Sequence, residues 1–282
     1  MSDMDTPRRP GPWDPRPEDL PPPAPAAAPQ AEPRDLPPVR EQGLGSALIS
    51  TLVLGSIVYL LTGSLVMVGA LLFAILVHEV GHMLAMNRLG MGPARVYILP
   101  FLGATVGQRP AKSEWHDVLV ALAGPAFGLL AAVPFAGLYL WTGDAVWLDA
   151  VLVVAFLNLI NLAPAPPLDG SRAIGPVLAM IHPMVERVVI LILGVLAVIW
   201  GVLNGMWLFA IFLAIALIGH LKARHWRAVA RKLTGVEAAK SVALFVLTAA
   251  ACAAVGVAAL LPDAGTTAEA ASHGARFLGI GR

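Results

Sequence analysis

Apolar residues dominate the chain from about residue 44 onward, in runs long enough for membrane helices. A helix needs about 20 residues to cross the hydrocarbon core, and polar or turn-forming residues interrupt the runs at similar intervals. The uncharged stretch 188–219 is too long for one crossing, and the turn-forming pair Asn204 and Gly205 divides it. The pattern predicts an all-α polytopic protein with about seven transmembrane helices, at 46–61, 64–87, 117–141, 145–163, 184–203, 206–221 and 241–261.

Composition supports the membrane assignment. Hydrophobic residues make up 57% of the 282 positions and charged residues 13%, whereas soluble domains are about 25% charged. The single cysteine, Cys252, excludes an intramolecular disulfide and a cysteine-based metal cluster. A net charge of +1 argues against nucleic acid as a partner, because phosphate binding needs a concentrated basic face. The lipid bilayer is the expected environment.

Residues 1–43 differ sharply from the rest of the chain. They contain thirteen prolines, interleaved with arginines and acids, and almost no branched apolar residues. Such a segment buries too little surface to offset its conformational entropy. We predict a disordered Pro-rich tail; the alternative is a polyproline ligand for a partner domain.

Basic residues gather on alternate connections between the predicted helices, as expected if those connections face the cytoplasm. The connections after the second, fourth and sixth helices hold, in turn, Arg88, Arg95, Arg109 and Lys112; Arg172; and Lys222, Arg224, Arg227, Arg231, Lys232 and Lys240. The intervening turns hold none. This asymmetry predicts a cytoplasmic N-terminus, although the basic loop 222–240 is also compatible with a lipid-headgroup or partner site.

An isolated polar group lies within the second apolar run. Between Glu41 and Arg88, the only charged or histidine residues are His78, Glu79 and His82. A charged side chain near the middle of a membrane helix costs about 2.5 to 3.5 kcal/mol on insertion scales, so it needs a compensating partner. A surface patch explains such a group in a soluble helix, but not at membrane depth. The run therefore indicates a functional site.

The spacing of this group is typical of a metal site. His78 and His82, at i and i+4, lie on one helical face and can bind the same ion. Glu79 can then reach a water molecule at the metal and act as its general base, the HExxH arrangement of metalloproteases. Because catalytic zinc usually takes three protein ligands, a third must come from elsewhere in the chain.

Asp169 is the best candidate for that third ligand. The other acids between Val118 and Ser171 are Asp144 and Asp149, which lie at an outer turn of the predicted topology. Three prolines in residues 164–167 prevent a regular helix just before Asp169. Irregular backbone at membrane depth is tolerated only inside protein or against a water-filled cavity. An acid on such a segment can turn toward the metal.

Two motifs together carry a family resemblance. HEVGH at 78–82 and NLAPAPPLDG at 161–170 closely resemble the paired HExxH and NxxPxxPLDG signatures of the site-2 protease family, which are intramembrane zinc metalloproteases. The order and separation of the motifs fit that family over roughly residues 64–182. The resemblance implies a zinc metalloendopeptidase of regulated intramembrane proteolysis, in a compact form without PDZ or CBS domains, acting on membrane-spanning protein substrates in a bacterial inner membrane.

The same resemblance assigns roles to individual residues. It implies that His78, His82 and Asp169 bind one zinc ion per chain, that Glu79 is catalytic, and that Asn161 lies near the site and contacts substrate. Many members carry an asparagine four residues after a Gly-Pro pair, but this chain has Gly128 there. Asn158 could replace that asparagine as a substrate contact; an ordinary interhelical hydrogen bond is the alternative.

Residues 96–106 predict two short extended pieces broken at Pro100 and Gly103. They resemble the small re-entrant strand segment that follows the HExxH helix in this family. An exposed edge there could hold an unwound substrate as an added strand, and a plain interfacial loop is the alternative. The remaining histidines are not expected to be ligands, because His116, His182, His220 and His225 lie near predicted membrane boundaries and His273 lies in the tail.

These expectations divide the chain into four parts. They are the tail 1–43, a catalytic membrane core at 44–183, additional transmembrane helices at 184–261, and a C-terminal tail at 262–282. Other functions compete with proteolysis. A metal transporter could use the same residues, but it needs a polar path on both sides of the ion. A catalytically silent scaffold has no need of a base beside two ligands, and a CAAX-type protease would need a glutamate as the third ligand.

Overall fold

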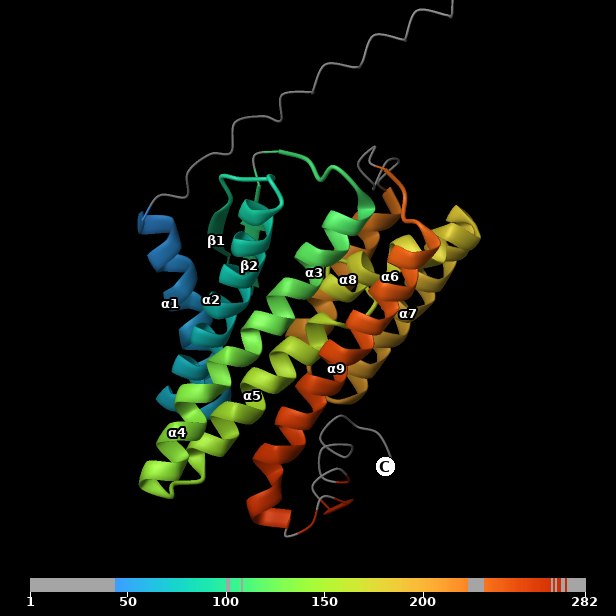
Figure 1. The fold of residues 1–282 in the computed structure, drawn as a ribbon. Coiled ribbons are helices and arrows are strands. Elements are labelled where there is room, and N and C mark those ends of the chain that lie inside the picture. The colour runs from blue at the N-terminus through green and yellow to red at the C-terminus, as the bar shows by residue number, and fades with distance from the viewer. Residues whose placement is uncertain are drawn as a thin grey trace, which may run out of the picture. The chain divides into compact units, whose positions relative to one another are not determined.

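The computed structural model describes residues 44–99, 102–107, 109–222 and 231–264, together with residues 266, 268, 269 and 272. Helices dominate these residues (Figure 1). They are α1 (Leu44–Thr62), α2 (Leu65–Arg88), α3 (Glu114–Gly128), α4 (Ala132–Thr142), α5 (Val146–Asn161), α6 (Asp169–Ile181), α7 (Pro183–Leu203), α8 (Trp207–Lys222) and α9 (Gly235–Ala264). A short 3₁₀ turn, η1 (Leu129–Ala131), joins α3 to α4. The predicted disordered tail lies outside the described residues.

Within the described residues, five stretches of helix are long and apolar enough to cross a membrane. They are Gly45–Thr62, Leu65–Arg88, Glu114–Thr142, Pro183–Leu203 and Gly235–Pro262. Two shorter apolar helices, Val146–Asn161 and Phe209–Leu221, occupy the other ranges in which the sequence predicts crossings. The chain is therefore an integral membrane protein with a mostly helical fold, as predicted, whereas the count of seven crossings stays a prediction.

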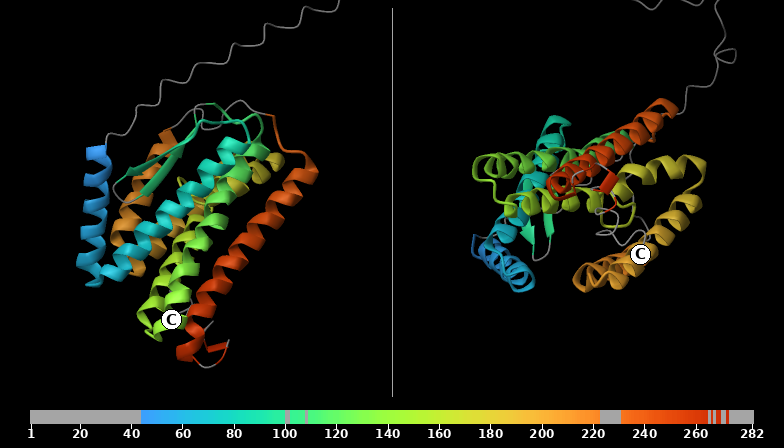
Figure 2. Two further views of the ribbon diagram at one scale, coloured as in Figure 1. Left: turned by 60° about the vertical axis from the view of Figure 1, so that its left-hand side comes forward. Right: turned by 90° about the horizontal axis from the view of Figure 1, so that it is seen from below.

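Helix α3 lies at the centre of the packing around the HExxH segment. It contacts α2, α5, α6 and α9, and α5 in turn packs against α2 and α9. Fully buried apolar residues in this region are small or β-branched, including Ala70, Ala74, Val118 and Ala121. Small side chains let membrane helices approach closely, where van der Waals packing and hydrogen bonds hold them. Helices α7 and α8 pack on each other, and α7 also packs on α6 (Figure 2).

A β-hairpin follows α2, as the sequence predicts. Strand β1 (Arg95–Leu99) pairs antiparallel with β2 (Leu102–Val106). The predicted break at Gly103 is wrong, because β2 begins one residue earlier and Gly103 pairs with Ile98. Strand β1 contacts α1, and β2 runs along α2. The hairpin therefore lies beside the helix that carries the HExxH sequence.

The proline-rich stretch after α5 ends in a helix that the sequence pattern does not predict. Residues 162–168 form turns, and α6 begins at Asp169. The chain folds back so tightly that a Cβ atom at Gly170 would collide with the main-chain oxygens of Leu162 and Ala163. Glycine is therefore required directly after Asp169, and the tight turn sets the position of that carboxylate.

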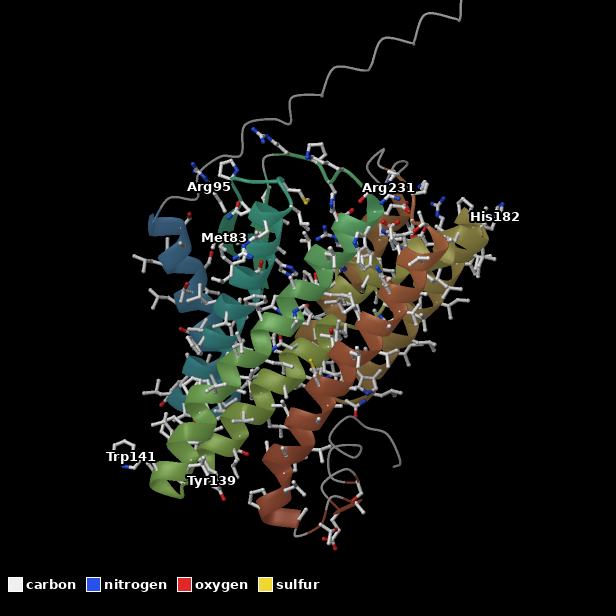
Figure 3. The ribbon with its side chains drawn as sticks, in the orientation of Figure 1. Met83, Arg95, Tyr139, Trp141, His182 and Arg231 are labelled. Carbon is white, nitrogen blue, oxygen red and sulfur yellow. The ribbon has the colours of Figure 1, made fainter. Side chains whose placement is uncertain are left out.

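Several basic residues and two aromatic residues lie at opposite ends of the helices. Figure 3 shows Arg95, His182 and Arg231 at one end, and Tyr139 and Trp141 at the other. Near the basic end, the buried carboxylate of Glu114 accepts hydrogen bonds from Lys232 Nζ at 2.8 Å and from the main-chain nitrogen of Leu233 at 3.1 Å. These bonds tie the start of α3 to the segment that enters α9.

Candidate metal centre

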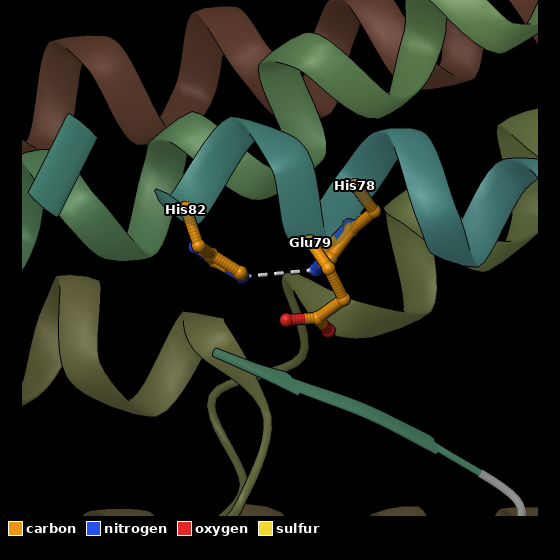
Figure 4. A group of neighbouring side chains, drawn as sticks. All are labelled: His78, Glu79 and His82. Atoms are coloured by element: carbon orange, nitrogen blue, oxygen red, sulfur yellow. Dashed lines mark hydrogen bonds between the residues drawn. The ribbon is translucent and has the colours of Figure 1, made fainter. Parts of the chain in front are cut away.

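Two imidazoles of α2 face the same point inside the protein (Figure 4). His78 and His82 are one helical turn apart, and 4% and 6% of their surfaces are exposed. Their Nε2 atoms lie 3.1 Å from each other. The i, i+4 spacing therefore brings both rings to one site, as the sequence predicts from helical geometry.

The carboxylate of Asp169 completes a triangle with these two nitrogens. Its Oδ2 atom lies 3.1 Å from His78 Nε2 and 3.2 Å from His82 Nε2. Asp169 reaches the site from the first residue of α6, after the turn that Gly170 makes possible. Two sequence segments that are far apart thus place three metal-ligating atoms within contact of one another.

The dimensions of this triangle suit a zinc ion. Tetrahedral zinc with ligand distances near 2.0 to 2.2 Å has ligands about 3.3 Å apart. The three edges of 3.1 to 3.2 Å are close to that value. Asp169 is the acid whose oxygen is in direct contact with both Nε2 atoms, and it therefore fits the third ligand position.

The outer nitrogens of both rings have hydrogen-bond acceptors, which fixes their tautomers. His82 Nδ1 lies 2.7 Å from the main-chain oxygen of Val120, which can only accept. His78 Nδ1 lies 2.9 Å from Asn158 Oδ1, and the Asn158 amide is oriented by its own bond from Nδ2 to the Val154 oxygen at 2.8 Å. Both Nδ1 atoms therefore donate, and a neutral imidazole then presents an acceptor lone pair at Nε2.

Three hydrogen-bond acceptor atoms consequently lie in contact with one another. Two Nε2 lone pairs and one carboxylate oxygen meet at about 3 Å in a buried site. Such an arrangement needs a cation or added protons, because acceptors in a low-dielectric interior repel one another. The residues fit a divalent metal ion, and ring-orienting bonds at Nδ1 are a common feature of histidine ligands.

Close packing of α3 against α2 leaves no room for a side chain beside the imidazoles. A Cβ atom at Gly124 would collide with the His82 ring and lie 2.8 Å from His78 Nε2. On the other helix, a Cβ atom at Gly81 would lie 2.7 Å from Phe127 Cβ. This pair of glycines lets the helices approach, and α3 therefore forms one wall of the site.

Glu79 lies beside the ligand triangle without belonging to it. Its side chain is 6% exposed, and its Oε2 atom accepts a hydrogen bond of 2.7 Å from Thr105 Oγ1 of β2. The ligand atoms of His78, Glu79 and His82 all lie within 4.8 Å of one another. This position suits a base that acts on a molecule bound at the triangle.

The two asparagines singled out from the sequence occupy different positions. Asn158 is fully buried and forms an interhelical bond to the ring of His78, and a Cβ atom at Gly128 would collide with its amide. Asn161 instead donates from Nδ2 to the oxygen of Leu157 in its own helix, at 2.9 Å. Asn158 thus lies behind the ring of His78 and supports it through this hydrogen bond.

Other histidines lie away from the site where the structure describes them. His182 caps the start of α7, where its ring accepts from the main-chain nitrogen of Met184. His116 lies in the first turn of α3, and His220 lies near the end of α8. His225 and His273 are outside the described residues.

Sequence reasoning did not identify Thr105, the Val120 oxygen or the close approach at Gly124. A main-chain oxygen carries no signature in sequence, and the position of Thr105 depends on the register of the hairpin. Gly124 could have been found in part, since a Gly-Pro pair inside a predicted membrane helix indicates a place of unusual packing.

Comparisons of the sequence with known proteins find similarity to metalloproteases. The model of peptidase family M50 matches residues 66–144, which include the HExxH segment and Gly124. The protein named "Putative zinc metalloprotease Rip3" from Mycobacterium tuberculosis is 30% identical over 162 residues, covering 49% of this chain and 41% of the relative. "Stage IV sporulation protein FB" from Bacillus subtilis is 33% identical over 131 residues, covering 40% of each chain.

The chain thus spans about 40% of the length of these curated relatives. No solved structure matches it significantly. The region that the family model matches includes the two histidines and the adjacent acid, whereas Asp169 lies outside it. The chain is thus similar to peptidase family M50 over residues 66–144, and its two motifs resemble those of the site-2 proteases.

Proposed function

We propose that the chain is an intramembrane zinc metalloprotease that hydrolyses peptide bonds of membrane-spanning substrates. His78, His82 and Asp169 hold one zinc ion, and Glu79 is the general base. The observation that carries the proposal is the buried triangle of three acceptor atoms with a carboxylate beside it. Two nitrogens and one oxygen form a typical ligand set of catalytic zinc, which leaves a fourth position open.

The depth of the site supports cleavage inside the bilayer. Glu79 lies nine residues before Arg88, the basic residue at the end of α2. At about 1.5 Å per residue, this separation is about 14 Å along the helix. The hydrocarbon core is about 30 Å thick, so the site lies near its middle if Arg88 marks the boundary.

The chemistry of the proposed reaction divides between the ion and the protein. A bound zinc ion supplies Lewis-acid polarisation to water and to a scissile carbonyl. Glu79 takes a proton from the attacking water and returns it to the leaving amine. The hydrogen bonds at His78 Nδ1 and His82 Nδ1 keep both rings oriented with Nε2 toward the reacting centre. Burial of these residues limits water at the site.

Charge and the relatives indicate the membrane and the orientation. Arg95 and Arg231 lie at the same end of the helices (Figure 3), and basic residues favour the cytoplasmic side. This distribution supports a cytoplasmic N-terminus. Both curated relatives come from bacteria, so we assign the chain to a bacterial inner membrane.

A transport function has weaker support from the described residues. A metal passing through the site would need polar groups on both sides of the triangle. The half of α2 before His78, residues 65–77, has no charged or histidine side chain. A single reaction centre near the middle of the membrane is the better explanation of the polar residues in α2.

Replacement of the proposed base tests the function directly. Glu79→Gln removes the proton acceptor but keeps the size of the side chain and all three proposed ligands. The variant should bind one zinc ion per chain and should lose at least a hundredfold in cleavage rate. The measurement compares zinc content by mass spectrometry, and new peptide termini in bacterial membranes that contain the wild-type chain or the variant.

The predicted difference is a set of cut sites within or beside membrane spans that appears only with the wild type. The wild-type protein treated with a zinc chelator serves as the matched control, because it should behave as the variant does. Equal cleavage by zinc-loaded Glu79→Gln would rule out the role of Glu79. Absence of any cleavage by the zinc-loaded wild type would contradict the protease assignment.

A further inference from the structure

The hydroxyl of Thr105 contacts the carboxylate that we assign as the general base. Thr105 Oγ1 lies 2.7 Å from Glu79 Oε2 and 3.1 Å from the main-chain oxygen of Glu79. A hydroxyl has one proton to donate, and both of these atoms are acceptors. The main-chain oxygen lies in the middle of α2, where helical bonding already satisfies it. The shorter, charge-assisted bond to the carboxylate is therefore the stronger one.

From this contact we infer that Thr105 is a positioning residue that holds Glu79 in place for catalysis. This inference rests on the proposed function. Glutamate has three rotatable bonds, so its carboxylate samples several positions unless a partner fixes it. Thr105 engages one carboxylate oxygen and, in the described part of the chain, Oε1 has no hydrogen-bond donor. The second oxygen is thereby left to accept a proton from water.

The hairpin is held firmly enough to act as such a support. At its start, the main-chain nitrogen of Ala94 donates to Asn87 Oδ1 at 2.9 Å. At its end, the nitrogen of Arg109 donates to the oxygen of Met91 at 3.1 Å. The first contact lies at the end of α2, two turns beyond Glu79, and the second lies three residues after that helix. They fix β2 along the same helix that carries the base.

The packing at Gly107 fixes the register of β2 more closely. A Cβ atom there would lie 2.8 Å from the main-chain oxygen of Met91 and 3.4 Å from Met86 Sδ of α2, so the chain directly after β2 passes close to the end of α2. Thr105 is two residues earlier, pairs with Val96 of β1, and is half-buried. A threonine hydroxyl at this position meets Glu79 without rearrangement of either element. The structural unit that would receive an extended substrate thus also orients the base.

Two substitutions separate the hydroxyl from the shape of the side chain. Thr105→Val keeps the volume and the β-branch but removes the donor, whereas Thr105→Ser keeps the donor and removes the methyl group. We expect Thr105→Val to lower kcat at least tenfold, because a hydrogen bond to a charged group is lost. KM and zinc content should stay within about twofold of the wild type, and Thr105→Ser should retain most of kcat. The substrate is a single-span protein whose cut site the comparison of membrane termini identifies.

A spectroscopic measurement tests the contact without any substrate. Infrared difference spectra between wild type and Thr105→Val should show a shifted carboxylate stretching band. The same comparison in a Glu79→Gln background should lack that band, which assigns it to Glu79. Presence of the band in the first comparison and its absence in the second supports the inference even if cleavage is never observed.

Several outcomes would overturn the inference. One is an unchanged kcat in Thr105→Val. The others are an equal loss of kcat in Thr105→Ser and a loss of zinc with either substitution, because both would point to packing and not to the hydroxyl. These results are distinguishable from failure of the proposed function, in which the zinc-loaded wild type itself shows no cleavage.

Discussion

The hydrogen bond between Asn158 and His78 places one buried residue directly behind a proposed metal ligand. Asn158 is fully buried, and its oxygen accepts from His78 Nδ1 while its nitrogen is held by the Val154 oxygen. The amide can therefore not turn without breaking a second bond. This arrangement fixes the ring plane and the tautomer of His78, which are the two properties that a metal ligand needs.

Removal of this acceptor should weaken metal binding. In Asn158→Ala, His78 Nδ1 loses its partner in a buried site, and we expect zinc affinity to fall by about 10- to 100-fold. Competition titration with a chromophoric chelator measures this change. Asn158→Asp keeps an acceptor oxygen and should retain more of the affinity.

Asn204→Ala is the matched control for this substitution. The Asn204 amide donates to the Trp200 oxygen of its own helix, away from the metal site, so its loss should leave zinc affinity unchanged. Equal affinities of wild type and Asn158→Ala would show that the bond to His78 has no role in metal binding.

The packing of α2 against α3 is the element-level feature that the ligand set requires. Gly124 and Gly81 allow the two helices to approach until the α3 backbone lies against the imidazoles. A methyl group at Gly124 meets rings that are held by bonds to Val120 and Asn158, so the rings cannot easily move aside. The helix pair and the metal site therefore depend on each other.

For this reason, the single methyl group that Gly124→Ala adds should strongly disturb the metal site. We expect at least a tenfold loss of zinc affinity and a lower Tm, because the added Cβ atom collides with the His82 ring. Alanine in a helix is otherwise favoured over glycine by about 1 kcal/mol. Calorimetry and zinc titration of the purified protein in detergent measure both effects.

Gly137→Ala in α4 provides the comparison. Nothing lies within 4 Å of a Cβ atom at that position, so this variant should bind zinc as the wild type does and melt at an equal or higher temperature. A Gly124→Ala protein with full zinc affinity would show that the helices can separate at no cost to the site.

Sequence patterns predicted the elements of this fold better than the contacts between them. The ranges of the apolar runs correspond to helices, and the isolation of His78, Glu79 and His82 in one run marked the site. Helix α6 was missed because Asp169 and Gly170 follow prolines, which conceal the helix start. The contact of Thr105 with Glu79 depends on how the hairpin lies on α2, and periodicity does not contain that information.

At the scale of the whole molecule, the positions of basic and aromatic residues bear on its orientation in the membrane. Arg95 and Arg231 lie at one end of the helices, and Trp141 lies at the other end with Tyr139 (Figure 3). Amphipathic aromatic rings are enriched at membrane interfaces, and arginine and lysine are enriched on the cytoplasmic side. The proposed orientation therefore has a direct consequence for which connections are accessible from outside the cell.

Thiol labelling of spheroplasts tests this orientation. Thr142→Cys, at the aromatic end, should react with a membrane-impermeant maleimide in intact spheroplasts. Lys112→Cys, at the basic end, should react only after the membrane is permeabilised. Both positions are exposed, and the wild type serves as the blank because Cys252 is buried. The reverse pattern of labelling would place the N-terminus outside.

The separation of the triangle's members along the chain has a consequence for biosynthesis. His78 and His82 enter the membrane with α2, but the Asp169 carboxylate arrives only after α3, α4 and α5 have been made. A ribosome-bound chain that ends before α6 would carry the base and two of the three ligands and would hold the ion weakly. Hydrolytic competence would thus appear late in synthesis, when most of the surrounding wall is already in place, and unfinished chains would be harmless to neighbouring membrane proteins.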